Sequence, residues 1–454
     1  MPVSTLPSSG LPEPLIHEIR AKATSLTEEL HQLQLALHGR PEIAWKEHFA
    51  HDQLTAYMER QAGWGVERHA CELPTAWKAV YEVGTGGPVI GFNSENGVVD
   101  ALRGIGHACG HNQIAIAGIA AALATAHVLE KHNLPGKVVL LGTPAEEAGG
   151  GKAYMLKRGA YEGMEACLML HPGWKGNGVG FATLSCSVAF SVKYTGASAH
   201  AGGMPEKGIN ALDAAVAAYT NIALLRQQVP SSHKIFNTIK GSEGWTANVI
   251  ASDSTFMVGM RTPTAQEAIS LTERVLNCLR AAALATGCQF EIRRESMYMD
   301  LRNATELENY FEDVCKSHWD GECTVDRLAS TAASDFLSNK ADYIQGNIGY
   351  AMPVLHPMYG LPDAREGDSP HSNTFAESTG LRSSTDATIH AAAMLAVVGT
   401  RLVVDRPWAE KVRAAWAEQY AVFGGQDTVD KVEKIVSAYP LAPEVSSDMC
   451  SCGH

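Results

Sequence analysis

The chain has 454 residues and a mass of 48.5 kDa, a length that predicts roughly three domains, or two with one enlarged, and a sizeable buried core. Hydrophobic residues make up 45% and charged residues 19% of the sequence, which excludes disordered, collagen-like and low-complexity proteins. The formal net charge of -13 disfavours nucleic acid and anionic membranes as partners, because nothing offsets the repulsion.

Residues 1–20 contain no apolar run of signal-peptide length behind a basic start. The apolar stretches 114–129 and 389–398 are Ala-rich and shorter than about 18 apolar residues, so they predict buried helices and no membrane span. The 10 cysteines are scattered through a long chain, which fits reduced thiols better than a disulfide scaffold. We therefore expect a cytoplasmic protein.

The N-terminal part begins with two amphipathic helical patterns, at 14–39 and 47–60. Residues 77–83 and 88–93 follow as short β-rich runs separated by the turn sequence GTGG. This spacing predicts an antiparallel pair of strands at one edge of a sheet.

Helical and strand patterns then alternate up to about residue 185. An Ala-rich helix at 112–132 precedes an apolar strand at 138–141, and a helix at 152–158 precedes another apolar strand at 166–170. Continuous apolar strands separated by helices predict an α/β fold with a mostly parallel sheet covered on both faces. Ligands of such sheets bind outside the carboxyl ends of the strands, so these ends are the first places to search for chemistry.

From residue 186 the pattern changes to β-α-β-β-α-β, which predicts an inserted ferredoxin-like domain. Its expected elements are 186–194, 209–228, 234–240, 254–260, 264–285 and 289–294. Helices at 306–318 and 383–404, with loop or short strand around 346–350, suggest that the chain then returns to the first domain. The predicted organisation is a first domain of 1–185 and 299–454 and a second of 186–298.

The segment 106–112, GHACGHN, lies at the start of the 112–132 helix and contains two ligand-type side chains. Cys109 and His111 would diverge on a helix, whereas on a Gly-rich turn both can point at one metal ion. A buried thiol near a histidine is the ordinary alternative.

The segment 142–151, GTPAEEAGGG, follows the 138–141 strand and holds Glu146 and Glu147. One of two adjacent carboxylates can bind a cation while the other acts as a general base. A solvated acidic turn is the alternative, but the flanking small and apolar residues are not typical of a solvent-exposed surface.

His171 follows the 166–170 strand, so it would lie at the same sheet edge as Glu146 and Glu147. The alternative interpretation of His171 is a core histidine.

These segments, in this order, resemble a family of dinuclear-metal amidohydrolases and exopeptidases that contains aminoacylases, carboxypeptidases and indole-acetyl-amino-acid hydrolases. The Cys-Gly-His branch is most similar, and within it the Xaa-Arg and β-alanyl-lysine dipeptidase-like group. The resemblance covers nearly the whole chain. Its further segments are Glu42 with Glu47, 74–76, 100–102, 199–201, 208–214 and 355–357 through to His371.

The resemblance implies a zinc-exopeptidase-like catalytic domain that binds two metal ions and hydrolyses an amide bond with a metal-activated water. It implies Glu146 as the general base and five metal ligands, which are Cys109, His111, Glu147, His171 and His371. Thiolate, imidazole and carboxylate together suit Zn²⁺, although Mn²⁺ or Co²⁺ could occupy such a site.

The second domain then corresponds to a lid. His200 resembles the family histidine that donates to the developing oxyanion, often across a dimer interface. Asn248 and Arg261 resemble the groups that hold a substrate carboxylate, which an Arg fork suits. A surface-loop histidine and a structural salt bridge are the alternatives. The open sheet edge of such a domain and the resemblance together favour a homodimer, with His200 acting in trans.

The sequence departs from the family around the substrate. Val98 stands where an acidic residue is usual, Arg103 and Ala251 each replace a proline, and Ile344 replaces an acidic residue. The leading interpretation is a hydrolase of dipeptides or N-acyl amino acids. Two alternatives remain open: an amidohydrolase or amide-forming enzyme of a biosynthetic pathway with an apolar substrate, and a non-catalytic metal-bound binding protein.

Overall fold

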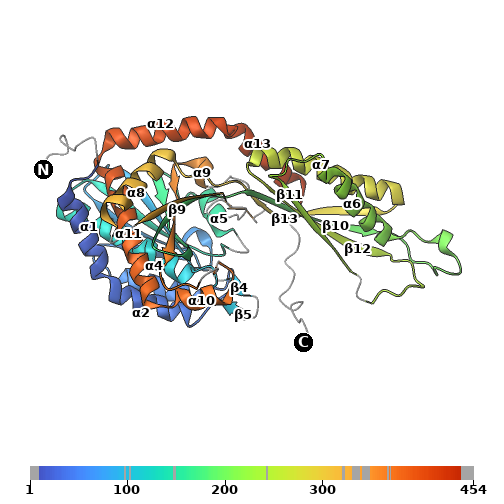
Figure 1. The fold of residues 1–454 in the computed structure, drawn as a ribbon, viewed down its shortest axis with the longest axis horizontal. Coiled ribbons are helices and arrows are strands. Elements are labelled where there is room, and N and C mark those ends of the chain that lie inside the picture. The colour runs from blue at the N-terminus through green and yellow to red at the C-terminus, as the bar shows by residue number, and fades with distance from the viewer. Residues whose placement is uncertain are drawn as a thin grey trace. The chain divides into compact units, whose positions relative to one another are not determined.

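The computed structural model describes most of the chain and divides it into two compact units (Figure 1). The described residues are 10–96, 99–101, 104–146, 150–241, 244–319, 323–329, 338–339, 348–365, 368 and 370–440. The first unit takes in residues 1–184, 301–339 and 345–425, and the second takes in 185–300, 340–344 and 426–454.

The main sheet of the first unit has the strand order β1-β2-β6-β3-β7-β16. Strands β6, β3, β7 and β16 run parallel to one another. At one edge, β2 pairs antiparallel with β6, and β1 pairs antiparallel with β2. The strands are β1 (Gly65–Arg68), β2 (Trp77–Val83), β3 (Val89–Glu95), β6 (Gly136–Thr143), β7 (Met164–Leu168) and β16 (Val354–Leu355). The prediction of an α/β fold with a mostly parallel sheet is confirmed.

The expected pairing of the 77–83 and 88–93 strands with each other is wrong. Both segments are strands, but β6 lies between them and pairs antiparallel with β2 and parallel with β3. The Gly-rich segment between β2 and β3 therefore spans a neighbouring strand. Each of the two strands gains more apolar contact with β6, which is buried on both faces, than a two-stranded ribbon could offer.

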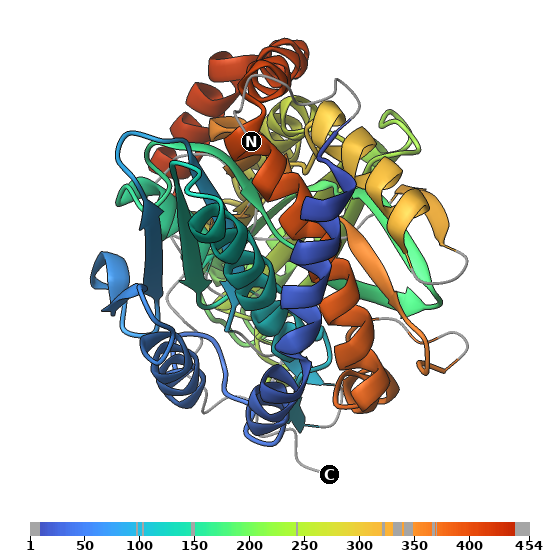
Figure 2. The ribbon, with the colours of Figure 1, turned by 90° about the vertical axis from the view of Figure 1, so that its left-hand side faces the viewer.

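Alternate residues of β6 enter two different apolar layers, which explains its unbroken hydrophobic sequence. Val138 and Leu140 pack in the layer beneath α1, α4 and α11. Val139 and Leu141 pack on the opposite face, with residues of α5 and α9. Figure 2 shows α1, α4 and α11 running side by side over the sheet.

By length and composition α4 and α11 could each cross a membrane, but 94% and 89% of their most apolar windows are buried inside the protein.

The predicted helix at 14–39 is divided at Leu26 into α1 and α2. Residues 348–351, expected as loop or strand, form the short helix α9. The helices of this unit are α1 (Glu13–Ser25), α2 (Thr27–His38), α3 (His48–Glu59), α4 (His111–Lys131), α5 (Gly151–Lys157), α8 (Thr305–His318), α9 (Ile348–Ala351), α10 (Asn373–Thr379), α11 (Arg382–Val404) and α12 (Arg406–Val422).

The first unit contains a second sheet, in the order β14-β9-β17-β8, that the sequence patterns do not predict. Its strands are short and three of the four contain Gly, so their sequences carry little strand signal. They are β8 (His171–Lys175), β9 (Gly178–Thr183), β14 (Thr324–Ala329) and β17 (Met358–Leu361), and a separate two-stranded ribbon joins β4 (Val99–Ala101) to β5 (Gly104–Gly106).

The second unit has the predicted β-α-β-β-α-β order. Its sheet runs β11-β12-β10-β13 with every neighbour in this series antiparallel, and α6 and α7 pack together on it. The elements are β10 (Cys186–Thr195), α6 (Ala211–Arg226), β11 (Lys234–Lys240), β12 (Asp253–Thr262), α7 (Ala265–Thr286) and β13 (Gln289–Tyr298). Thr264 caps α7 through a complete capping box with Glu267.

The C-terminal segment from 426 is predicted to belong to the first domain, but it groups with the second unit. It contains most of α13 (Gly425–Ala438) and the residues after it. The Tyr439 ring packs edge-on against Phe190, with centroids 5.5 Å apart, and the Arg294 backbone N–H donates to the Pro440 carbonyl at 2.9 Å. A long-range contact of this kind leaves no local sequence signal.

Candidate metal centre

The chemistry-bearing segments of the first unit meet at one edge of the main sheet. Strands β3, β6 and β7 are parallel, and they end at Glu95, Thr143 and Leu168. Glu146 and His171 follow two of these ends, and α4 begins at His111. The site therefore lies where ligands of parallel sheets are expected.

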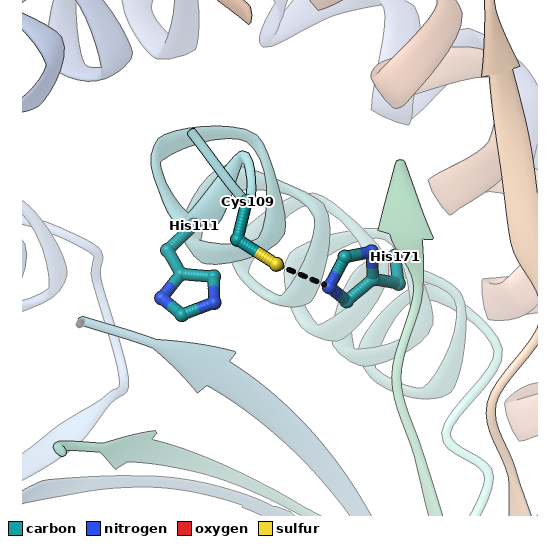
Figure 3. Close-up of side chains that lie close together, drawn as sticks. All are labelled: Cys109, His111 and His171. Atoms are coloured by element: carbon teal, nitrogen blue, oxygen red, sulfur yellow. Dashed lines mark hydrogen bonds between the residues drawn. The ribbon is translucent and has the colours of Figure 1, made fainter. Parts of the chain in front are cut away.

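Cys109, His111 and His171 form one group whose ligand atoms all lie within 4.8 Å of one another. The Sγ atom of Cys109 lies 3.3 Å from Nε2 of His171 (Figure 3). Cys109 and His111 are buried, and His171 is partly exposed. The structure thus brings together three of the residues that the sequence indicated as ligands.

Glu95, His111 and Glu146 form a second group within the same distance limit. Nε2 of His111 lies 3.5 Å from Oε2 of Glu95 and 3.6 Å from Oε2 of Glu146. The side chains of Glu95 and His111 are each 1% exposed, and that of Glu146 is 10% exposed. Two carboxylates therefore approach one imidazole nitrogen.

The GHACGHN segment folds as a tight turn because of its second glycine. Gly110 has a φ of 83°, and a Cβ there would lie 2.5 Å from Cγ of Pro172. His107 fixes the same turn by accepting from the Asn112 N–H through Nδ1 and contacting the Leu37 carbonyl through Nε2. Burial lowers the pKa of His107 to about 3, so it is neutral and structural.

The backbone just before Glu146 is held by Glu47, which precedes α3. Oε1 of Glu47 accepts from the Ala145 N–H at 2.7 Å, and Oε2 accepts from the Thr75 hydroxyl at 2.8 Å. Ala145 has a φ of 55°, a left-handed conformation that L-residues rarely adopt. Burial raises the pKa of Glu47. The contact with Glu47 therefore supports a strained turn at the base of the candidate catalytic carboxylate.

Glu95 also belongs to a buried ion pair. Its Oε1 lies 2.7 Å from Nζ of Lys152, and neither side chain is more than 1% exposed. Burial acts to raise the pKa of Glu95, but the charge of Lys152 outweighs it and holds the pKa below its usual range. Glu95 is thus a carboxylate and not a carboxylic acid.

The other two expected ligands, Glu147 and His371, are not among the two groups of converging ligand atoms in the described residues. Glu147 lies outside the described residues. The His371 backbone N–H donates to the Ala108 carbonyl at 2.7 Å, which brings this residue to the GHACGHN turn. The His371 side chain is exposed and the residue has a φ of 72°, and among the described residues it belongs to neither ligand group.

The candidate oxyanion donor, His200, and the two candidate substrate-binding residues, Asn248 and Arg261, lie in the second unit. The Ala201 N–H donates to the Asn248 carbonyl at 2.8 Å, and His200 pairs with Val249, so the His200 and Asn248 segments are adjacent. Both side chains are exposed. Arg261 on β12 is partly buried, and its Nη1 has no hydrogen-bond partner within the described part of the chain. Burial lowers the pKa of this guanidinium.

Of the four departures from the family pattern, Val98, Arg103 and Ile344 lie outside the described residues. Ala251 accepts from the Ala211 N–H at 2.9 Å and so supports the start of α6.

The sequence patterns assign no role to Glu95, Lys152 or His356. His356 is buried, its ring lies 5.8 Å from that of His171, and its backbone N–H donates to Asn303 at 2.7 Å. Burial lowers its pKa to about 3. Glu95 is the last residue of a parallel strand, and His171 follows another such strand. The same kind of sequence position that indicated His171 therefore also marks Glu95.

The donor set fits divalent transition metals. One thiolate, imidazole nitrogens and carboxylates are the ligands that zinc and its neighbours use in proteins. Their ligand atoms converge in a buried region at the end of the sheet, as the two groups show. Surface acidic clusters, by contrast, lack both the thiolate and the burial.

Comparison with known proteins agrees with this site. The sequence profile of the peptidase family M20/M25/M40 matches residues 94–346. The chain belongs to this family. The match includes the end of β3 and the GHACGHN and GTPAEE segments, so the resemblance inferred from the motifs is confirmed.

Curated relatives include the Xaa-Arg dipeptidases of Mus musculus and Homo sapiens, which are 35% and 34% identical over 402 residues, covering 85% of this chain and 88% of each relative. The indole-3-acetyl-aspartic acid hydrolase of Enterobacter agglomerans is 27% identical over 55% of this chain and 57% of its own.

Among solved structures, a putative aminohydrolase from methicillin-resistant Staphylococcus aureus has a TM-score of 0.66 at 18% identity, covering 83% of this chain and 99% of its own. A dinuclear metal-binding peptidase of the M20 family from Bacillus subtilis has a TM-score of 0.58 at 19% identity, over 82% and 99%. The fold is therefore that of this family. The family and its relatives identify the chain as a hydrolase of amide or peptide bonds.

Proposed function

We propose that this protein is a metal-dependent dipeptidase that uses a pair of divalent ions, with zinc as the native metal and Mn²⁺ or Co²⁺ as possible substitutes. The observation that carries the proposal is the convergence of two ligand groups, one with a thiolate and one with two carboxylates, around His111. The ligands would be Cys109, His111, Glu147, His171 and His371.

When bound, the ions would polarise the amide carbonyl and lower the pKa of a water toward about 7. Glu146 would take the proton of the attacking water and deliver it to the leaving amine. Glu47 would support this step by fixing the backbone of Ala145, next to Glu146. Retention of Glu146 argues against a non-catalytic binding protein, which has no use for a general base.

For the substrate, we propose a dipeptide whose C-terminal residue is basic, with N-acyl amino acids as the wider class. The support is the name and the identity of the mammalian relatives. Arg261, with a buried Nη1 that makes no hydrogen bond to the described residues, would bind the substrate carboxylate together with Asn248. His200 would donate to the oxyanion.

The first experiment compares metal content and substrate range. Protein loaded with Zn²⁺, Mn²⁺ or Co²⁺ would be assayed against Xaa-Arg, Xaa-Lys and neutral dipeptides, N-acetyl amino acids and indole-3-acetyl-aspartate. We expect about two equivalents of metal per chain, loss of turnover on chelation and its return on reloading. Preferential cleavage of an indole-acetyl or other apolar amide would favour the biosynthetic-type alternative. Failure to bind metal, or equal turnover by Glu146→Gln, would refute the proposal.

We further propose that residues 186–298 act as a lid and dimerisation domain of a cytoplasmic homodimer. Strand β11 lies at one end of the strand series of the second unit, where a second copy could pair. If His200 acts in trans, mixed dimers of Glu146→Gln and His200→Ala chains hold one site with both wild-type groups. Activity regained after the chains exchange would support this arrangement, whereas a fully active monomer at high dilution would contradict it.

A further inference from the structure

Glu95 presents its two carboxylate oxygens to different partners. Oε1 lies 2.7 Å from Nζ of Lys152, and Oε2 lies 3.5 Å from Nε2 of His111. Glu95 is the last residue of β3, and Lys152 is on the first turn of α5. Because Glu95 and Lys152 come from separate elements and are both buried, this geometry is set by the fold and not by a flexible surface contact.

The distances at His111 are those expected around a metal ion. Ligand nitrogen and oxygen atoms bound tetrahedrally at about 2.0–2.2 Å lie about 3.3–3.6 Å from each other. The separation from His111 Nε2 to Oε2 of Glu95 is 3.5 Å. A direct N–H···O hydrogen bond would bring the same atoms to about 2.9 Å. Glu95 and His111 therefore leave between them the space that a cation fills.

A simple salt bridge does not explain the second oxygen. The pair with Lys152 uses Oε1, yet Oε2 is directed at His111, beside another buried carboxylate. Bringing two carboxylates together away from water is costly, and a divalent cation offsets that cost. A neutral imidazole has one nitrogen lone pair, so His111 can bind one ion and cannot serve both ligand groups.

We propose that Glu95 is a further metal ligand, which completes the ion held by His111 and leaves Glu146 available as the base. Lys152 is the positioning residue that fixes Oε1, so that Oε2 faces the ion. This assignment rests on the proposed metal-dependent function and adds a carboxylate to the five ligands named above.

The test is titration with Co²⁺, read by metal content and by absorption. The wild-type chain should bind about two Co²⁺, with a thiolate-to-cobalt charge-transfer band from Cys109. Glu95→Gln should bind about one and keep that band, because the lost ion is the one at His111. Lys152→Met should retain both sites but weaken one by about 10–100-fold, as loss of a group that orients a ligand typically does.

Glu95→Gln also removes the carboxylate that faces the buried Lys152 charge, which can destabilise the fold. The double variant Glu95→Gln/Lys152→Met removes both charges and separates the two roles. It should still bind about one Co²⁺ if Glu95 is a ligand. If it binds two with wild-type affinity, Glu95 only balances Lys152 and the inference is overturned.

A crystal structure of the metal-loaded wild-type protein decides the question without any variant. An oxygen of Glu95 at about 2.0–2.2 Å from an ion would support the assignment. A Glu95 carboxylate outside bonding distance of every ion would overturn it. Failure of wild-type protein to bind Co²⁺ would instead contradict the proposed function itself, so the two failures are distinguishable.

Discussion

Removal of the Glu47 carboxylate should both destabilise the first unit and slow catalysis. Glu47, Thr75 and Ala145 are all fully buried, and the carboxylate accepts from the Ala145 N–H at 2.7 Å and the Thr75 hydroxyl at 2.8 Å. In Glu47→Ala both donors lose their acceptor, and each buried unsatisfied donor costs about 1–3 kcal/mol. Burial raises the pKa of Glu47, so loss of the buried charge returns part of that cost. We expect a net loss of about 3 kcal/mol.

Matched variants separate the two hydrogen bonds. Thr75→Val removes one donor and should cost about half as much as Glu47→Ala. Glu47→Gln keeps an acceptor for the Ala145 N–H and an amide group beside Thr75, so it should cost about 1 kcal/mol or less. The expected order of destabilisation is Glu47→Ala, then Thr75→Val, then Glu47→Gln.

Urea unfolding followed by tryptophan fluorescence measures these differences. Of the 8 tryptophans, Trp245 is the one within the residue ranges of the second unit, so fluorescence reports mainly on the first unit. Turnover should fall by about 10–100-fold in Glu47→Ala, because Ala145 and then Glu146 lose their fixed position. Wild-type stability in Glu47→Ala, or equal losses in all three variants, would refute the reasoning.

Three further predictions concern other parts of the first unit. Glu146→Gln should keep the metals and lose turnover by orders of magnitude, whereas Glu147→Gln should lower metal content, and exchanged phenotypes would reverse the two roles. Although burial acts to raise the pKa of Glu18, its contacts with His132 and Lys131 hold the pKa below its usual range. Glu18→Gln should therefore cost up to about 1 kcal/mol in urea unfolding at neutral pH, and the difference should vanish as the pH falls through that lowered value, since protonated Glu18 no longer pairs. Gly118→Ala places a Cβ 2.3 Å from the Asn93 carbonyl oxygen, and Gly399→Ala places one 2.6 Å from the Phe92 ring. Gly118→Ala should cost about 1–3 kcal/mol of unfolding free energy through overpacking. It should lower the thermal midpoint more than Gly399→Ala does, because a backbone carbonyl cannot move aside as a ring can.

Local patterns in the sequence are sufficient for much of the fold. Strands β2 and β11 have the expected bounds, and the β-α-β-β-α-β order of the second unit is the predicted one. These elements have strong period-2 or period-3.6 patterns bounded by Gly, Pro or capping residues, and such signals are local. The family is also determined by sequence, because the GHACGHN and GTPAEE segments and His171 occur in a fixed order.

The pairing of strands and the full composition of the site required the tertiary structure. The insertion of β6 between β2 and β3, and the joining of Tyr439 to Phe190, depend on burial between distant segments, which no local pattern records. The same holds for Glu95: its sequence position marks it only as a strand end, and its role follows from the buried Lys152 and His111 that the fold places beside it. The amino-acid sequence determines which side chains can carry the chemistry, whereas long-range packing decides which of them share one metal centre.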